Sequence, residues 1–187
     1  MKNTIYTITI AALILFLACS TKSVTNKHFT PGAIWLDNNN IHINAHGGGI
    51  LFDNGVYYWF GEHKTEGENG NLANVGVHCY SSTGLYNWTD EGIALAVMPP
   101  SSRSDIEEGC ILERPKVIKN KKTGKYIMWF HLEPKGKGYK GALSGVAISD
   151  NVTGPYTYIK AVRPNAGHYP LNVLDIHKLD SPALNLS

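Results

Sequence analysis

Apolar runs separated by turn residues fill most of the chain, and almost none of it has the periodicity of a helix. Residues 50–52 and 56–60 are apolar or aromatic and flank the pair Asn54-Gly55. Such a pair between apolar runs predicts a hairpin, because both turn positions need positive φ. A second hairpin is predicted over residues 117–130, so the pattern indicates an all-β chain.

The two predicted hairpins are similar to each other. The Trp-Phe pair at 59–60 recurs 70 positions later at 129–130, and the Gly-Val pair at 76–77 recurs 69 positions later at 145–146. Each unit continues into a turn of the form Gly-x-Tyr and a further apolar run. A four-stranded antiparallel unit that occurs twice is typical of the blades of a β-propeller. The alternative is two unrelated meanders with chance matches, which three matched features at one spacing disfavour.

The spacing of the repeat also bears on completeness. The hairpins begin near residues 50 and 117, so a third would begin near residue 186, and the sequence ends at Ser187. Propellers close with about four to eight blades. We therefore expect about two blades of a larger propeller, truncated here, over residues 31–167. Residues 168–187 are expected to be a divergent tail or the start of a truncated third blade.

The first residues have the pattern of an export signal. An apolar run at residues 5–18 follows Lys2 and is too short for a comfortable membrane span, so residues 1–18 are predicted to be a signal peptide. The run ends in Phe16-Leu17-Ala18-Cys19, which resembles a bacterial lipobox with Cys19 as the acylated residue. Ordinary secretion is the alternative. We expect a lipoprotein of the cell envelope, or a periplasmic or extracellular protein, with residues 19–30 as a polar tether.

Charge and motif content exclude several classes of function. The 17 basic and 15 acidic residues give a net charge of +2, which provides no case for binding nucleic acid or an anionic membrane surface. We expect membrane contact only through a lipid anchor. The sequence has no phosphate-binding glycine loop, no nucleophile elbow and no recognised metal-binding spacing, so no cofactor and no metal are expected. Export permits a disulfide between Cys79 and Cys110, although a buried free thiol is favoured for Cys79.

Several polar residues lie where the inner strand of each blade would meet a central channel. His46 precedes three glycines, Glu62 follows the second strand, and Glu113 and Arg114 begin the second repeat. Carboxylates accept hydrogen bonds from sugar hydroxyls, and aromatic rings pack on the C–H faces of sugars. A glycosidase needs two groups that flank the scissile bond, for which Glu62 and Glu113 are the candidates. The alternative is that Glu113 and Arg114 form a local ion pair between blades.

The same segments resemble glycoside hydrolase family 43, in the branch of the exo-β-1,3-galactanases. Ile-Asn-Ala-His-Gly-Gly-Gly at 43–49 and Tyr-Tyr-Trp-Phe-Gly-Glu-His-Lys at 57–64 resemble its first blade. Leu-Glu-Arg-Pro-Lys-Val at 112–117 and Met-Trp-Phe-His at 128–131 resemble its second, and the resemblance covers roughly residues 31–167. It implies a five-bladed propeller and exo-acting, inverting cleavage of β-linked galactan.

The resemblance also assigns residues to the site. It places Glu62, Glu113 and Arg114 in the subsite for the terminal sugar, and Tyr139 joins them from a loop of different length. We include His46 among the candidate substrate-binding residues.

The chain departs from this branch at its end. The branch's general acid is a Glu on a later blade, its proposed base also comes later, and the expected Ser-Arg-Asp segment is missing after Asn165. The catalytic residues are therefore expected beyond Ser187. We expect a glycosidase that hydrolyses O-glycosyl bonds in plant-type polysaccharide and is incomplete and inactive as this chain alone. The alternative is a non-catalytic carbohydrate-binding surface lipoprotein or an inactive gene fragment.

Overall fold

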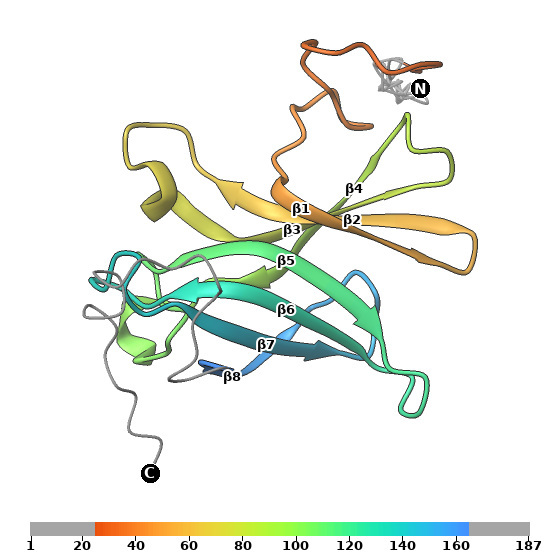
Figure 1. Ribbon diagram of the computed structural model, residues 1–187. Helices are drawn as coiled ribbons and strands as arrows, with labels where there is room; N and C mark the ends of the chain where they lie inside the picture. The colour runs from red at the N-terminus through yellow and green to blue at the C-terminus, as the bar shows by residue number, and fades with distance from the viewer. Residues whose placement is uncertain (1–24, 165–187) are drawn as a thin grey trace, which may run out of the picture.

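A computed structural model describes residues 25–164, which form two four-stranded antiparallel sheets (Figure 1). The first sheet has the strand order β1 (His46–Asp53), β2 (Val56–Lys64), β3 (Asn74–Ser82) and β4 (Thr89–Ala96). The second has the order β5 (Ile111–Lys119), β6 (Tyr126–Glu133), β7 (Leu143–Ser149) and β8 (Thr157–Val162). Two short 3₁₀ turns lie in the connections, η1 (Gly70–Ala73) and η2 (Pro100–Ser102). The two predicted blades are confirmed.

The hairpin between β1 and β2 turns at the residues that the sequence indicated. Asn54 and Gly55 both have positive φ, at 51° and 83°, and Asp53 pairs with Val56 across the turn. Because the turn fixes the register, Phe60 and Glu62 fall on one face of β2. This face is turned toward the second sheet, where Phe60 is buried in the core.

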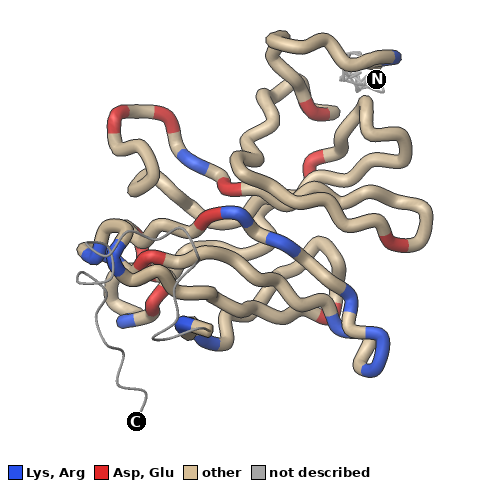
Figure 2. Tube along the Cα trace, in the orientation of Figure 1, with Lys and Arg blue, Asp and Glu red and all other residues tan. Residues whose placement is uncertain are grey.

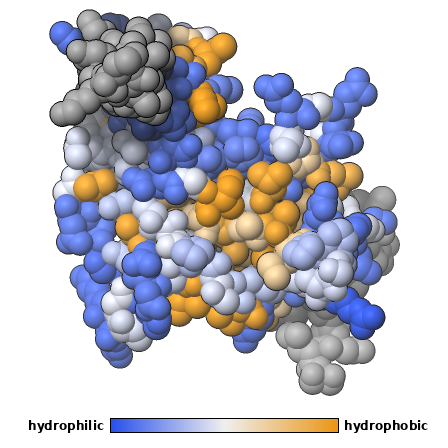
Figure 3. Space-filling model, turned by 180° about the vertical axis from the view of Figure 1, so that it is seen from behind, coloured by the Kyte–Doolittle hydropathy of each residue, from blue (hydrophilic) through white to orange (hydrophobic). Residues whose placement is uncertain are grey.

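The core lies between the two sheets, which pack with β1 and β5 side by side (Figure 1). Buried residues from both sheets form one cluster, which includes Phe60 and Cys79 of the first sheet and Val117, Met128 and Phe130 of the second. A smaller cluster covers the other face of the first sheet, where Ile43, Ala45, Tyr80 and Trp88 are buried and Trp35 packs against them. Apolar side chains also extend across the middle of the surface seen in Figure 3. Each sheet therefore buries one face against the other sheet.

The first strands of the two sheets contain the same irregularity. The register shifts within residues 46–49 of β1 and within residues 113–116 of β5. The second residue of each segment, Gly47 or Arg114, has a positive φ of 55° or 53°. Such bulges bend a strand and redirect its side chains. The two blades are therefore structurally equivalent at the positions that carry the candidate site residues.

The strand pairing at these bulges shows that the repeat spacing in the second strands differs from the spacing matched in the sequence. The residue paired with the last bulge residue is Phe60 in β2 and Trp129 in β6, which gives a spacing of 69 (129 − 60). The sequence matched Phe60 to Phe130, a spacing of 70. Side chains alternate between faces along a strand, so an error of one position exchanges the faces. Phe60 faces the core from the first sheet and Phe130 faces it from the second, so they lie on opposite faces of equivalent strands. Trp129, the equivalent of Phe60, lies on the face of the second sheet that points away from this core and is 42% exposed.

Cys79 and Cys110 are both buried free thiols, so no disulfide joins them. Burial raises the pKa of the Cys110 thiol to about 11 and raises that of Cys79 further. Within residues 25–164, no helix is long and apolar enough to cross a membrane. The predicted signal peptide, Cys19 and residues 168–187 lie outside the described residues.

Candidate functional site

Two buried carboxylates lie close to each other where the end of β2 meets the start of β5. Glu62 is 4% exposed and Glu113 is 7% exposed. Figure 2 shows that each of these strands carries an acidic residue close to a basic one in this region. An ionised carboxylate is costly to bury unless it is paired and hydrogen-bonded, so the partners of both groups decide what the site can do.

Glu62 is held by one cation and one backbone amide. Its Oε2 lies 2.9 Å from Nζ of Lys64, and its Oε1 accepts a hydrogen bond of 3.1 Å from the backbone N–H of Arg114. The bulge in β1 makes room for this carboxylate, because a Cβ at Gly47 would lie 2.6 Å from Oε1 of Glu62. Glycine is therefore required at position 47 both by its φ and by the close approach of Glu62.

Glu113 is held by a hydroxyl and an amide from two different loops. Its Oε1 accepts hydrogen bonds of 2.5 Å from the hydroxyl of Tyr139 and 3.2 Å from Nδ2 of Asn71. The guanidinium of Arg114 is 4.0 Å from Oε2 of Glu113, and the Arg114 side chain is 72% exposed. An exposed pair at that distance contributes only about 0–1 kcal/mol. A local Glu113–Arg114 ion pair is thus a weak account of why Glu113 is buried here.

Lys64 and Asn71 connect the two carboxylates, and the sequence analysis missed both. Nζ of Lys64 donates a 2.6 Å hydrogen bond to Oδ1 of Asn71, whose Nδ2 in turn reaches Glu113. The sequence could have indicated Lys64, because it lies two residues after Glu62 in a predicted strand and therefore on the same face. Asn71 had no comparable signal, because it lies in η1 and reaches the site only through the path of the 65–73 loop.

The structure brings together four of the five predicted substrate-binding residues, namely Glu62, Glu113, Arg114 and Tyr139. The hydrogen bond from Tyr139 to the Glu113 carboxylate, followed by burial, raises the pKa of the Tyr139 phenol. His46 is placed differently. Its backbone pairs with Glu62 in the β1–β2 ladder, and its side chain is exposed. The site therefore presents fixed carboxylate oxygens beside an exposed guanidinium and an exposed phenol.

A histidine cluster lies on the opposite face of β2. Nδ1 of His63 is 2.8 Å from Nδ1 of His78, and Nε2 of His78 is 2.5 Å from Oδ1 of Asp90. Burial, and then the neighbouring His78, lower the pKa of His63. Within residues 25–164, no group of three or more potential ligands is arranged to hold a metal ion. The cluster therefore forms a hydrogen-bonded network behind the carboxylate site.

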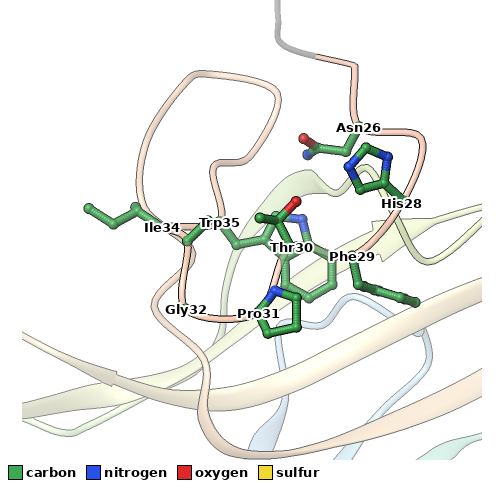
Figure 4. Close-up of a pocket in the computed structure, with 9 residues that line it drawn as sticks. Asn26, His28, Phe29, Thr30, Pro31, Gly32, Ile34 and Trp35 are labelled. Atoms are coloured by element: carbon green, nitrogen blue, oxygen red, sulfur yellow. The ribbon is translucent and has the colours of Figure 1, made fainter.

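A separate hollow of about 340 Å³ lies on the N-terminal segment and is lined by residues 26 and 28–35 (Figure 4). Its walls include Phe29, Pro31 and Trp35, and it shares no residue with the carboxylate site. Asn26, which lines this hollow, exchanges hydrogen bonds with Asn87 that join the segment to the turn after β3.

Comparisons with solved structures agree with the architecture and with the resemblance seen in the sequence. No family model and no curated protein sequence matches the chain. A family 43 β-1,3-galactosidase, solved with galactodeoxynojirimycin, is 55% identical with a TM-score of 0.68. The match covers 79% of this chain and 42% of that one.

Two exo-β-1,3-galactanases are also similar. The enzyme from Phanerochaete chrysosporium, solved with β-1,3-galactotriose, is 39% identical with a TM-score of 0.63, over 71% of this chain and 29% of that one. The enzyme from Clostridium thermocellum is 36% identical with a TM-score of 0.61, over 71% of this chain and 27% of that one. The resemblance to the family 43 galactanase branch is thus confirmed, and the chain spans less than half the length of each of these relatives.

Proposed function

We propose that this chain, which resembles family 43 galactosidases and galactanases over most of its length, is part of a glycoside hydrolase that releases sugar from the ends of β-1,3-galactan. Within that enzyme, Glu62 and Glu113 accept hydrogen bonds from the hydroxyls of the terminal sugar. Arg114 and Tyr139 line the same site, and His46, which pairs with Glu62 in the β1–β2 ladder, lies beside it. A similar galactanase was solved with β-1,3-galactotriose, which supports an oligosaccharide ligand.

One observation carries this proposal, namely the pair of buried carboxylates linked through Lys64 and Asn71. A network of this kind holds acceptor oxygens in fixed positions, so less conformational entropy is lost when the ligand binds. Sugar hydroxyls are recognised by such fixed charged acceptors.

We propose that these residues bind the sugar rather than donate a proton. Oε1 of Glu113 already accepts two hydrogen bonds, and both oxygens of Glu62 already have donors nearby. A general acid must instead place a proton on the leaving oxygen. We propose that the general acid and the base of the complete enzyme come from residues other than these. The acceptor-only geometry also favours the second candidate, a non-catalytic carbohydrate-binding protein.

The test replaces Glu113 by Gln, which keeps the shape and removes the charge. Binding of galactose and β-1,3-galactotriose by the full chain is measured by calorimetry, with Glu91→Gln as the control. Glu91 is exposed on β4, where it bonds to Ser81. Loss of a charge-assisted hydrogen bond is expected to weaken binding roughly 10- to 100-fold at an unchanged melting temperature.

Two results would refute the sugar site. One is binding that is equal in wild type and the Glu113→Gln variant. The other is a collapse of the melting temperature with normal binding by the folded fraction, which is the result expected of a purely structural Glu113.

We further propose that the protein is exported and anchored through an acylated Cys19, with ordinary secretion as the alternative. The pattern of residues 1–19 motivates this proposal. Expression in a bacterium with labelled fatty acid should label the wild-type chain and leave the Cys19→Ser variant unlabelled. An unlabelled wild-type chain with a cleaved N-terminus would favour secretion.

A further inference from the structure

Tyr139 reaches the carboxylate site from an exposed loop that has little intrinsic stiffness. The loop spans residues 134–142 between β6 and β7, and Gly136, Gly138 and Gly141 account for three of its nine residues. Glycine has the widest backbone freedom and the largest entropic cost of ordering. The loop sequence therefore does not by itself explain how the hydroxyl of Tyr139 is kept within 2.5 Å of Glu113.

A buried carboxylate at the end of β6 closes this loop. Glu133 is 1% exposed, and its Oε2 accepts hydrogen bonds of 2.7 Å from the backbone N–H of Gly141 and 3.0 Å from that of Ala142. Hydrogen bonds from backbone amides to a carboxylate are charge-assisted and strong. The fit is close, because a Cβ at Gly141 would lie 2.8 Å from Oε2 of Glu133.

The same carboxylate orients the aromatic neighbour of Tyr139. Nε2 of His131 lies 3.1 Å from Oε1 of Glu133. The rings of His131 and Tyr139 are nearly parallel, with an interplanar angle of 10° and centroids 6.2 Å apart. His131 also pairs with Glu113 in the β5–β6 ladder, so it lies between Glu133 and the sugar site. Contacts thus lead from Glu133 to Glu113 both through the loop backbone and through the His131 ring.

We propose that Glu133 is a positioning residue of the sugar site, which holds the 134–142 loop and the His131 ring so that Tyr139 donates its hydroxyl hydrogen bond to Glu113. The inference rests on the proposed function, since it assigns Glu133 a part in the sugar affinity of that same site. Glu133 itself touches no sugar in this scheme. Its effect on affinity passes through Tyr139.

The test compares Glu133→Gln with Glu107→Gln in the full chain. Glu107 is a matched control because its carboxylate contacts the same loop from outside, 3.8 Å from Nζ of Lys135. Two measurements need no sugar, namely hydrogen–deuterium exchange of the 134–142 peptide and the titration of Tyr139. The titration is obtained as the difference in phenolate absorbance between each protein and the same protein with Tyr139→Phe.

In Glu133→Gln, we expect the amides of Gly141 and Ala142 to exchange roughly tenfold faster or more, since each loses a charge-assisted hydrogen bond. The raised pKa of Tyr139 should fall toward the ordinary value of about 10, because the phenol no longer faces Glu113 in a fixed position. Galactose affinity should fall about 5- to 20-fold, because the hydroxyl of Tyr139 no longer holds the Glu113 carboxylate in position. Glu107→Gln should change none of the three.

A double-mutant cycle separates positioning from general destabilisation. If Glu133 acts through Tyr139, the double variant Glu133→Gln/Tyr139→Phe binds galactose no more weakly than Tyr139→Phe alone. Losses that multiply, or an unchanged Tyr139 titration in Glu133→Gln, overturn the proposal. A wild-type chain that binds no galactose, but whose Tyr139 responds to Glu133→Gln as described, refutes the proposed function and leaves the positioning role standing.

Removal of a buried carboxylate can prevent folding, so a second variant tests the same link. The His131 side chain is partly exposed, so His131→Ala removes the stacked ring without opening the core. We expect the Tyr139 pKa to fall partway while the Gly141 amide stays protected by Glu133. No change in the Tyr139 titration would remove His131 from the proposal.

Discussion

Asn74 provides the sharpest test of how the two sheets are joined. It lies at the start of β3 and is 2% exposed. Its Nδ2 donates a 2.9 Å hydrogen bond to the carbonyl of Leu112 in β5, and its Oδ1 accepts one of 2.8 Å from the N–H of Gly76. The residue that follows Leu112 is Glu113, so this link also fixes the strand segment that carries the sugar site.

The magnitude follows from the two groups that Asn74→Ala leaves unpaired. The carbonyl of Leu112 and the N–H of Gly76 would each lose a buried partner, at about 1–3 kcal/mol per group. We therefore expect the free energy of unfolding to fall by about 2–6 kcal/mol. For a chain of this size the melting temperature falls about 2–4 °C per kcal/mol, which gives a decrease of roughly 4–24 °C.

The assay is thermal unfolding followed by circular dichroism, with two further variants. Asn74→Asp can still accept from Gly76 and cannot donate to Leu112, so it isolates the hydrogen bond between the sheets. Asn39→Ala is the control, because Asn39 is exposed and its side chain accepts only a 3.4 Å contact from Asn38. A melting temperature for Asn74→Ala within about 2 °C of wild type would refute the reasoning. A normal value for Asn74→Asp would show that only the local Gly76 bond matters.

Three further predictions concern charge, thiols and completeness. Hydrogen bonds from Tyr126 and then Lys119 lower the pKa of Asp53, so the stabilising effect of its carboxylate is present above the unfolded-state pKa of about 4 and is lost as the pH falls through the folded-state value. The difference in unfolding free energy between wild type and Asp53→Asn, measured by urea unfolding, should therefore disappear at low pH. A difference that stays constant with pH would contradict this. Burial raises the thiol pKa of Cys110 to about 11 and that of Cys79 further, so alkylation of either thiol at neutral pH should require unfolding. Rapid labelling of the folded chain by iodoacetamide would contradict this. The chain spans 42% of a similar galactosidase, and apolar side chains such as Trp129 are exposed among residues 25–164. Alone it should therefore release no galactose from β-1,3-galactan and should associate in light scattering, and an active, monodisperse monomer would refute this.

The local features of the fold could be predicted from the sequence because they depend on neighbouring residues. Asn54 and Gly55 specify a turn whose dihedral angles few other pairs adopt, and the apolar runs on both sides specify the strands. The two four-stranded units follow from the same local signals, repeated. Glu62 and Glu113 could be named as a pair because each lies at the end of its hairpin that is away from the turn, Glu62 late in β2 and Glu113 early in β5.

The spacing of the repeat shows where sequence matching fails. The letters Trp-Phe recur after 70 positions, but a bulge in each first strand sets the structural spacing at 69 in the second strands. Pairing across a ladder fixes which face a residue occupies, and the ladder forms between segments that the one-dimensional pattern treats separately. Only the three-dimensional structure could show that Phe60 is equivalent to Trp129.

The sequence by itself determined the strands, the turns, the two-blade organisation and the choice of carboxylates, since each rests on short-range geometry or on residue type. The tertiary structure alone decided which groups surround those carboxylates. Asn71 and Tyr139 reach Glu113 from loops 42 and 26 residues away, and Glu133 fixes the second of these loops from inside the protein. No periodicity encodes such contacts, because the path of a loop is set by the few hydrogen bonds that close it rather than by the pattern of its own residues.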